Sequence, residues 1–318
     1  HTGTTKFNMR GLVITCILIG LLETAVAFSV NQQVPTKVLV TGAAGRTGRL
    51  VFGKLIQHDK FDPIALVRSE GSGRRLIKDS DCGLERVVVC DVVEDLAANG
   101  PPLEGLDGTD VMIICTSAVP VLSKKSLFKS MVKAPFNVLR GKKAIDFRTF
   151  RFKFKKGQYP EMVDYEGQVA QIDLAKKLGV ERVVIVSSMG GTDPDNFLNN
   201  VGKKPDGSGN GDILLWKRKA ERYLIDSGLA YTIIHPGGLV DAEPGVEELV
   251  IDVDDKLMDN QKRSISRADV ASLCMASLTI PDNKQTNISI DCITRVMEEG
   301  ESSPKSAETV LADFLKTG

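Results

Sequence analysis

The sequence predicts an α/β protein built on a Rossmann-type, doubly wound parallel sheet with helices on both faces. Two observations predict this fold. Short apolar runs rich in β-branched residues alternate along the chain with stretches of helical pattern, as they do in a parallel sheet that helices cover on both faces. A glycine-rich segment also separates the first apolar run from the first helical stretch, where Rossmann folds hold a dinucleotide.

These patterns place the expected elements. The expected strands are Lys37–Val40, Pro63–Val67, Arg86–Cys90, Val111–Cys115, Arg182–Ser187 and Tyr231–His235. The expected helices are Arg46–His58, Val163–Leu178, Ile213–Ser227, Arg267–Thr279 and Ser306–Leu315. The length of 318 residues and the 42% hydrophobic content suit one domain and a tail. We expect a single domain over residues 37–318, preceded by a targeting segment over residues 1–36.

An apolar segment near the N-terminus predicts a signal peptide. Met9 and Arg10 precede an apolar run, Gly11–Leu22, and Ala25-Val26-Ala27 then has the small-x-small pattern of a cleavage site. A positive start, an apolar run of about a dozen residues and such a site are typical of secretory signal peptides. We expect cleavage after about Ala27. The run is short for a membrane span, although an uncleaved anchor stays open.

Phe28, directly after the predicted cleavage site, indicates a destination. A signal peptide followed by a segment that starts with phenylalanine resembles the bipartite plastid-targeting signal of algae with secondary plastids. The stretch Phe28–Thr36 carries no acidic residue, which is also typical of transit peptides. We expect import into a plastid (chloroplast) through this signal, with the secretory pathway as the alternative.

The glycine-rich segment predicts a diphosphate site. Val38-Leu39-Val40 leads into Thr41-Gly42-Ala43-Ala44-Gly45-Arg46-Thr47-Gly48, which has the pattern G-x-x-G-x-x-G. The first glycine allows the tight turn, the second lets the backbone approach the diphosphate, and the third lets helix and strand pack closely. The free N–H groups at the helix N-terminus then bind the anion. The residues expected to contact the dinucleotide are Gly42, Ala44, Gly45, Arg46, Thr47 and Gly48.

The end of the second strand favours NADP over NAD. NAD-binding folds of this kind usually place an acid there for the ribose 2′-hydroxyl, whereas this chain has Val67-Arg68-Ser69. Arg68 and Arg46 together suit a 2′-phosphate, because guanidinium groups bind phosphate bidentately. Glu70, two residues further on, leaves NAD open as the less favoured cofactor.

Further motifs follow in an order that one family shares. Cys90-Asp91-Val92 follows the third expected strand, and Thr116-Ser117-Ala118-Val119-Pro120 follows the fourth. Later motifs are Val186-Ser187-Ser188-Met189-Gly190-Gly191-Thr192, Trp216-Lys217-Arg218-Lys219-Ala220-Glu221, His235-Pro236-Gly237-Gly238-Leu239 and Ser266-Arg267-Ala268-Asp269-Val270-Ala271. From Val38 to about Leu315 the chain resembles the atypical short-chain dehydrogenase/reductase family. It is most similar to the NmrA-like NAD(P)-binding proteins of plant and algal plastids.

The resemblance implies where the rest of the cofactor lies. The implied positions are Asp91 and Val92 against the adenine, Thr116, Ser117 and Ala118 beside the nicotinamide ribose, Lys217 on that ribose, and Pro236, Gly237 and Gly238 against the nicotinamide. Plainer readings stay open. Asp91 is also able to cap the following helix, and the proline and glycines are also able to turn the chain.

The catalytic motif of the superfamily is incomplete in this chain. These reductases use Y-x-x-x-K, in which the lysine lowers the tyrosine pKa and the tyrosine passes the proton. Lys217 aligns with that lysine, but Ile213 stands four residues before it and carries no proton to transfer. The remaining proton sources are Ser187, Ser188 or water, with hydride supplied by the cofactor. The candidate catalytic residues are therefore Lys217, Ser187 and Ser188.

Two classes of function stay open. One is an NADP-dependent oxidoreductase acting on an unknown small substrate. The other is a non-catalytic NADP-binding protein, either a plastid assembly or regulatory factor or a soluble domain of unassigned role. A reductase should have a concave substrate pocket over Gly237, whereas an assembly factor should have an apolar or basic docking surface.

A basic insert covers residues 121–160. It holds 12 Lys or Arg and one acid, Asp146, which leaves 29 basic and 40 acidic residues for the rest of the chain. Phe150, Phe152 and Phe154 alternate with basic residues, so an extended segment would place the three rings on one face. Basic residues interleaved with aromatics suit an anionic membrane surface or an acidic protein partner. A phenylalanine lid over the active site is the alternative.

Composition argues against other classes. The whole chain balances 41 basic against 41 acidic residues, so nucleic acid is not expected as a partner. The six cysteines are scattered, with no C-x-x-C pair and no histidine at ligand spacing. We therefore expect neither a metal site nor a disulfide framework.

Overall fold

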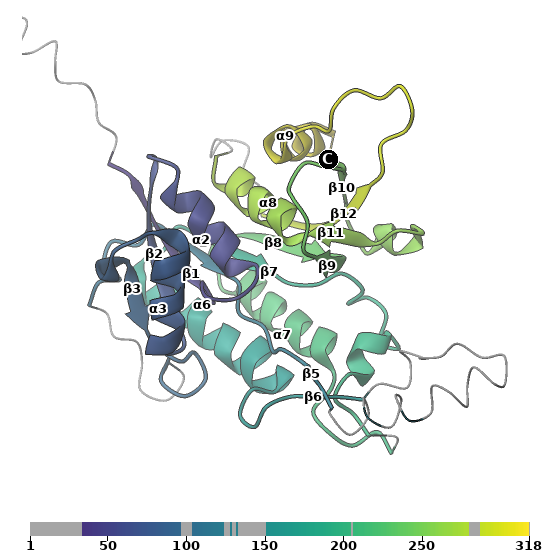
Figure 1. The fold of residues 1–318 in the computed structure, drawn as a ribbon. Coiled ribbons are helices and arrows are strands. Elements are labelled where there is room, and N and C mark those ends of the chain that lie inside the picture. The colour runs from purple at the N-terminus through teal and green to yellow at the C-terminus, as the bar shows by residue number, and fades with distance from the viewer. Residues whose placement is uncertain are drawn as a thin grey trace, which may run out of the picture. The chain divides into compact units, whose positions relative to one another are not determined.

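The computed structural model describes residues 34–96, 104–123, 128, 132, 151–204, 206–279 and 287–317 (Figure 1). By its internal contacts the chain divides into His1–Pro35 and one compact unit, Thr36–Gly318. The predicted signal peptide and most of the predicted basic insert lie outside the described residues.

One mostly parallel sheet forms the centre of the compact unit. Within the described residues its strands lie in the order β10 (Glu248–Asp252), β12 (Ile288–Arg295), β8 (Ala230–Pro236), β7 (Arg182–Val186), β4 (Val111–Ile114), β1 (Thr36–Thr41), β2 (Phe61–Val67) and β3 (Val87–Val89). All neighbours are parallel except β10 and β12. This order is that of a doubly wound Rossmann sheet with one antiparallel edge strand. The predicted fold class is confirmed.

Helices cover both faces of the sheet (Figure 1). One face packs against α2 (Gly48–Ile56), α3 (Glu70–Ser80), α8 (Arg267–Thr279) and α9 (Ala307–Thr317), and the other against α6 (Gly167–Leu178) and α7 (Ile213–Asp226). In β1, Val38 and Val40 belong to the first core and Leu39 to the second. Successive strand side chains point to opposite faces, so β1 is buried on both sides.

Several element boundaries differ from the expectation. Helix α2 begins at Gly48, two residues after the predicted start, and β3 is preceded by a 3₁₀ turn, Leu84–Arg86. A π-helix, η3 (Glu161–Glu166), replaces the first turn of the helix predicted from Val163. Helix α3 was not predicted, because its sequence is mostly polar or glycine and only Leu76 and Ile77 are large and apolar.

Two small sheets lie beside the main one. Strand β9 (Gly238–Val240) pairs with β11 (Ser264–Ser266), and β5 (Val121–Leu122) pairs with β6 (Phe152–Lys153). The prediction that three phenylalanines share a face is wrong for the two that are described, since Phe152 is exposed and Phe154 is buried. Strand β6 ends at Lys153, so Phe154 leaves the strand geometry and turns into the core. Phe150 lies outside the described residues.

Candidate functional site

The glycine loop, residues 41–48, lies at the carboxyl edge of the sheet between β1 and α2. In the sheet order β1 stands between β2 and β4. The chain builds outward from β1 through β2 and β3, then crosses back to β4 on the other side. Ligands of open α/β sheets bind at such a switch point, outside the carboxyl ends of the strands.

Backbone geometry explains the glycines of this loop. Gly42 has a φ of +65°, and a Cβ there would lie 2.9 Å from backbone atoms of Cys115 and Thr116. A Cβ on Gly48 would lie 2.3 Å from the carbonyl oxygen of Gly42, and the Gly45 N–H donates to that same oxygen at 2.8 Å. The turn is therefore closed by backbone contacts that only glycine allows.

Polar groups at this loop fit a bound anion. The buried hydroxyl of Thr41 has no hydrogen-bond partner within the described part of the chain, although buried polar groups are nearly always paired. Thr47, which precedes α2, makes no side-chain cap, and the first turn of the helix has no acidic residue. The N–H groups of Arg49 and Leu50 in α2 already donate to carbonyls of the loop, so the loop offers a ligand the positive dipole end of the helix and the N–H groups that precede them. Ala44, Gly45 and Arg46 are half-buried or exposed, and the loop fits a dinucleotide diphosphate.

Both arginines expected at a 2′-phosphate have protein partners. Arg46 pairs with Asp241, whose other carboxylate oxygen accepts from Arg267 at 2.8 Å. The hydrogen bond from Arg46, with the nearby charge of Arg267, holds the pKa of Asp241 below its ordinary value. Arg68 donates to the side-chain oxygen of Gln158 at 2.6 Å. Arg46 and Arg68 are exposed, and exposed pairs contribute little free energy, so an anion is able to replace either partner.

Asp91 caps a turn in this structure. Its Oδ1 accepts hydrogen bonds from the N–H groups of Val93, at 2.9 Å, and Glu94, at 3.4 Å. This is the plainer role left open for Asp91, and its contact with adenine stays a prediction. The side chain of Val92 packs in the core with Ile172 of α6.

The segment after β4 is held from the side of α6. The carbonyl oxygen of Thr116 accepts from Nε2 of Gln168 at 3.1 Å. The N–H of Ala118 donates to Oδ2 of Asp164 at 3.1 Å, and Ser117 between them is exposed. The backbone of this segment is also fixed close to the glycine loop, because the N–H of Cys115 donates to the carbonyl of Thr41 at 3.1 Å and a Cβ on Gly42 would lie 2.9 Å from the Thr116 nitrogen.

Lys217 lies inside the protein. Its Nζ is 2.7 Å from Oδ1 of Asp164, and both side chains are buried. Asp164 therefore connects Lys217 to the N–H of Ala118. Sequence reasoning missed Asp164, which lies in η3 outside every motif that we singled out. The role of Lys217 at a ribose stays a prediction.

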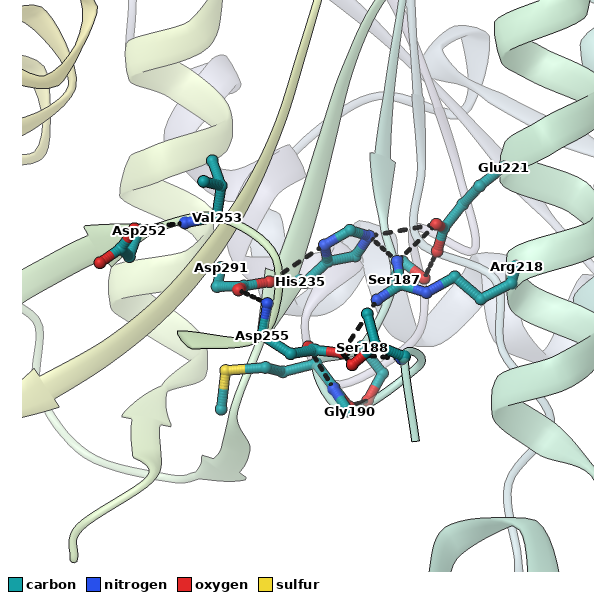
Figure 2. A network of polar contacts seen from close by, with 12 residues as sticks. Ser187, Ser188, Gly190, Arg218, Glu221, His235, Asp252, Val253, Asp255 and Asp291 are labelled. Carbon is teal, nitrogen blue, oxygen red and sulfur yellow. Dashed lines mark hydrogen bonds and ion pairs between the residues drawn. The ribbon is translucent and has the colours of Figure 1, made fainter. Parts of the chain in front are cut away.

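Ser187 belongs to a buried polar cluster that we call the His235 network (Figure 2). The hydroxyl of Ser187, directly after β7, donates to Oε1 of Glu221 on α7. Nε2 of His235, in β8, lies 3.1 Å from Oε2 of Glu221, and Nδ1 lies 3.2 Å from Oδ1 of Asp291 in β12. Arg218 also donates to Glu221, at 2.6 Å, and its guanidinium contacts Nε2 of His235. The members are Ser187, Arg218, Glu221, His235, Asp255 and Asp291.

Opposite charges stabilise one another in this network. Burial alone would lower the pKa of His235, but its hydrogen bonds with Asp291 and Glu221 raise it above the ordinary value. Burial alone would raise the pKa of Glu221, but hydrogen bonding and charge from His235, together with Arg218, lower it. Hydrogen bonding to the two carboxylates thus favours the charged form of His235, whereas the charge of Arg218, which contacts Nε2 of His235, opposes it.

Asp255 joins the network to the loop after β7. Its own N–H donates to Asp291 at 2.6 Å, and its carboxylate accepts from the N–H groups of Gly190, at 2.6 Å, and Thr192, at 2.8 Å. Burial alone would raise its pKa, but these hydrogen bonds lower it. Ser188 in the same loop is half-buried and bonds only weakly to the carbonyl of Met189, at 3.3 Å.

The residues after β8 turn the chain. The carbonyl oxygen of Pro236 accepts from the N–H of Met189 at 3.1 Å, and the N–H of Gly238 donates to the carbonyl of Arg263 at 2.6 Å. A Cβ on Gly237 would lie 2.3 Å from that same Arg263 oxygen. Glycine is therefore required here by packing, and a contact with nicotinamide stays a prediction.

The structure shows neither a metal cluster nor a membrane span in the part of the chain that it describes. No group of three or more His, Cys, Asp or Glu side chains there is arranged to hold a metal ion. No helix there is long and apolar enough to cross a bilayer. The described cysteines are free thiols, and burial raises the pKa of Cys90 to about 11 and that of Cys115 to about 12.

Comparison with known proteins agrees with this site. The sequence profile of the NAD(P)H-binding family matches residues 42–281. The chain is 43% identical to sanguinarine reductase from Eschscholzia californica, over 78% of this chain and 85% of that protein. It is 41% identical to an uncharacterised chloroplastic protein of Arabidopsis thaliana, over 79% of this chain and 67% of that protein. Its fold is similar to that of an oxidoreductase from Lactococcus lactis, with a TM-score of 0.54 at 19% identity, over 88% and 97% of the two chains.

Proposed function

The chain belongs to the NAD(P)H-binding family, and we propose that it is an NADP-dependent oxidoreductase that reduces a small molecule. One observation carries the proposal: a continuous hydrogen-bonded route leads from the buried imidazole of His235 through Glu221 to Ser187. Ser187 follows β7, two strands from the glycine loop in the sheet order. The similarity to sanguinarine reductase supports a reductive reaction.

The glycine loop would hold the diphosphate of the cofactor, which supplies a hydride when bound. Thr41 and the N–H groups at the start of α2 would bind its oxygens. Arg46 and Arg68 would exchange Asp241 and Gln158 for oxygens of a 2′-phosphate. That exchange is the reason to favour NADP over NAD.

Ser187 would deliver the proton in place of the missing tyrosine. Its hydroxyl gives a proton to the substrate atom that becomes negative when hydride arrives. Glu221 passes the replacement proton to Ser187 and takes one from Nε2 of His235, which then takes a proton from solvent. Each turnover therefore consumes one proton, as a reduction by NADPH requires.

Lys217 and Asp164 would act as positioning residues for this reaction. Together they fix the N–H of Ala118 in the segment expected beside the nicotinamide ribose. Ser188, half-buried in the loop after β7, is the second candidate donor, although no carboxylate contacts its hydroxyl among the described residues.

NADPH oxidation, followed by absorbance, tests this proposal with a panel of quinones, aldehydes and imines. We expect Ser187→Ala to lower kcat by about 100-fold while the NADPH affinity stays unchanged. Ser188→Ala should change kcat far less. The control, Ser272→Ala on α8, should match the unmodified protein. Full kcat in the Ser187→Ala protein would contradict the proton route.

A non-catalytic NADP-binding plastid assembly or regulatory factor is the second candidate. We use the name β5–β6 hairpin for residues 121–123 and 152–156. Its exposed lysines, Lys153, Lys155 and Lys156, favour this candidate, because they would suit a docking surface. Tight NADPH binding without oxidation on any compound of the panel would support this candidate over the reductase.

We also propose that the protein acts in a plastid. The Arabidopsis relative is chloroplastic, and Phe28 follows the predicted cleavage site. Residues 1–36 fused to a fluorescent protein should carry it into the plastid of an alga with a secondary plastid, and Phe28→Ala should stop that import. Secretion of the unmodified fusion would contradict the proposal.

A further inference from the structure

A cavity of about 600 Å³ lies at the β5–β6 hairpin, and its lining includes no residue of the glycine loop or of the His235 network. It is lined by Val121, Leu122, Ser123, Lys153, Phe154, Lys155 and Lys156. This volume is within the range of small-molecule sites. Gly237, over which a substrate pocket was expected, does not line it.

We propose that this cavity binds an anionic aromatic or amphipathic small molecule, and that such a molecule is the substrate class of the oxidoreductase. The claim that this molecule is a substrate rests on the proposed function. The binding site itself follows from the charges and apolar side chains of the hairpin.

Unpaired positive charge is the first argument. Lys153, Lys155 and Lys156 are exposed, and none of their side chains forms an ion pair with any other residue that the structure describes. Three neighbouring ammonium groups repel one another. A bound anion would relieve that repulsion, and it would be attracted to the cavity from solution.

An apolar floor is the second argument. Phe154 is 8% exposed and packs with Ala118 and Val163, whereas Phe152 is 39% exposed. A Cβ on Gly202 would lie 2.6 Å from the Phe154 ring, so that ring is wedged against a second loop. Val121 and Leu122 add apolar surface to the same cavity. A ligand that fits would therefore carry an apolar body as well as its negative charge.

Continuity with the cofactor edge is the third argument. Phe154, in the cavity wall, contacts the cluster that contains Ala118. The N–H of Ala118 donates to Asp164, and Asp164 pairs with Lys217. Arg68, expected at the cofactor, also bonds to Gln158 just beyond the hairpin. The cavity thus lies next to the predicted nicotinamide end of the site.

The sequence left an anionic membrane or an acidic protein open as partners of this insert. The described lysines line a hollow together with Phe154, whereas a membrane surface requires basic groups over a broad face. A small anion therefore fits better than a membrane, and the membrane becomes an outcome of the test.

Fluorescence titration with anilinonaphthalene sulfonate, an aromatic anion, tests the site on the whole chain. The variant is Lys153→Gln, Lys155→Gln and Lys156→Gln combined. We expect its affinity for the probe to fall about tenfold, and added salt to weaken binding to the unmodified protein. The control combines Lys60→Gln, Lys78→Gln and Lys177→Gln, three exposed lysines on other elements, and should bind like the unmodified protein.

Three results would overturn the inference. The first is equal probe affinity in the hairpin variant and the unmodified protein. The second is neutral phenylnaphthylamine binding as tightly as the anionic probe. The third is lysine-dependent sedimentation with phosphatidylglycerol vesicles while probe binding is unchanged, because the hairpin would then be a membrane-docking surface.

The reductase assay separates this inference from the proposed function. With naphthoquinone sulfonate as substrate, the hairpin variant should show a KM about tenfold higher and an unchanged kcat, whereas neutral naphthoquinone should show no change in KM. Lysine-dependent probe binding without any NADPH oxidation would keep the anion site and remove the reductase. Oxidation of both quinones with the same KM in both proteins would keep the reductase and overturn the substrate class.

Discussion

At the carboxyl edge of the sheet, charged groups are exposed in one half of the site and buried in the other. We call the glycine loop the nucleotide half, and the His235 network together with the Asp164–Lys217 pair the substrate half. At the glycine loop, the side chains of Arg46 and Asp241 are 63% and 65% exposed. In the His235 network, those of Glu221 and Asp291 are 6% and 1% exposed. Water screens the exposed pair at the glycine loop but not the buried carboxylates that face His235. Charge changes should therefore alter ligand preference in the first half and protein stability in the second.

The two halves also differ in what gives them their shape. The glycine loop is closed by backbone contacts within residues 41–48 and with Thr116. The His235 network and the Asp164–Lys217 pair are closed by side chains from η3, α7, β8 and β12. The first half needs the right backbone, and the second needs every buried charge to keep its partner.

The largest effect on the free energy of unfolding should come from breaking the buried Asp164–Lys217 ion pair of the substrate half. Lys217→Met leaves Asp164 charged and without its cation, which should lower the free energy of unfolding by about 3 to 5 kcal/mol. Adding Asp164→Leu removes the second charge and should recover part of the loss. Chemical denaturation measures both changes.

Lys177→Met, at an exposed position, is the control and should stay within about 0.5 kcal/mol of the unmodified protein. A loss from Lys217→Met as small as that of the control would contradict the account of a buried pair.

The next effect tests the nucleotide half, whose shape depends on backbone contacts. In Gly48→Ala the new Cβ would meet the Gly42 carbonyl at 2.3 Å, so the loop must shift. We expect NADPH affinity to fall about 100-fold, because the N–H groups then point away from the diphosphate. Gly53→Ala in the same helix meets no atom within 4 Å and should keep full affinity in a calorimetric titration. Equal affinity in both variants would show that the loop does not bind the cofactor.

A smaller effect concerns pH. Because the folded pKa of His235 is raised above 6.5, its stabilisation is fully present below pH 6.5 and is lost as pH rises through the folded pKa. The free energy of unfolding should therefore fall over that rise. His235→Arg keeps the positive charge, so this part of the pH dependence should disappear in denaturation curves. An unchanged pH profile in the variant would assign the dependence to another group.

The smallest stability effect is expected at Asp241. Its pair with Arg46 is exposed, but Arg267, whose side chain is 10% exposed, loses a charged acceptor as well, so Asp241→Asn should lower the free energy of unfolding by about 1 kcal/mol. It frees Arg46 and removes a carboxylate that would repel a phosphate, so NADPH affinity should rise about threefold while NADH affinity stays constant. Equal gains for both dinucleotides would show that Arg46 does not contact the 2′-phosphate.

The nucleotide half was predictable because its signals are local. The pattern Gly42-x-x-Gly45-x-x-Gly48 gave the loop, apolar runs gave most strands of the sheet, and the bounds of α8 match the prediction. Ser187 and Lys217 were found as candidates through the motifs that contain them. Arg218 and Glu221 stand in the same motif as Lys217, but the sequence assigned them no role.

The substrate half escaped prediction because its contacts join distant positions. Asp164 meets Ala118 across 46 residues, and Asp255 meets Gly190 across 65. No local pattern marks an aspartate that will meet a partner so far along the chain. The opposite burial of Phe152 and Phe154 likewise depends on where a two-residue strand ends.

Calorimetric titration of the chain with NADPH, NADP, NADH and NAD tests the central claim most directly, namely that the glycine loop holds an NADP dinucleotide. The account predicts binding of NADPH and NADP at least about tenfold tighter than NADH and NAD, because only the former offer a phosphate to Arg46 and Arg68. Absence of binding by all four would contradict the claim, and equal binding by all four would remove the assigned role of the two arginines.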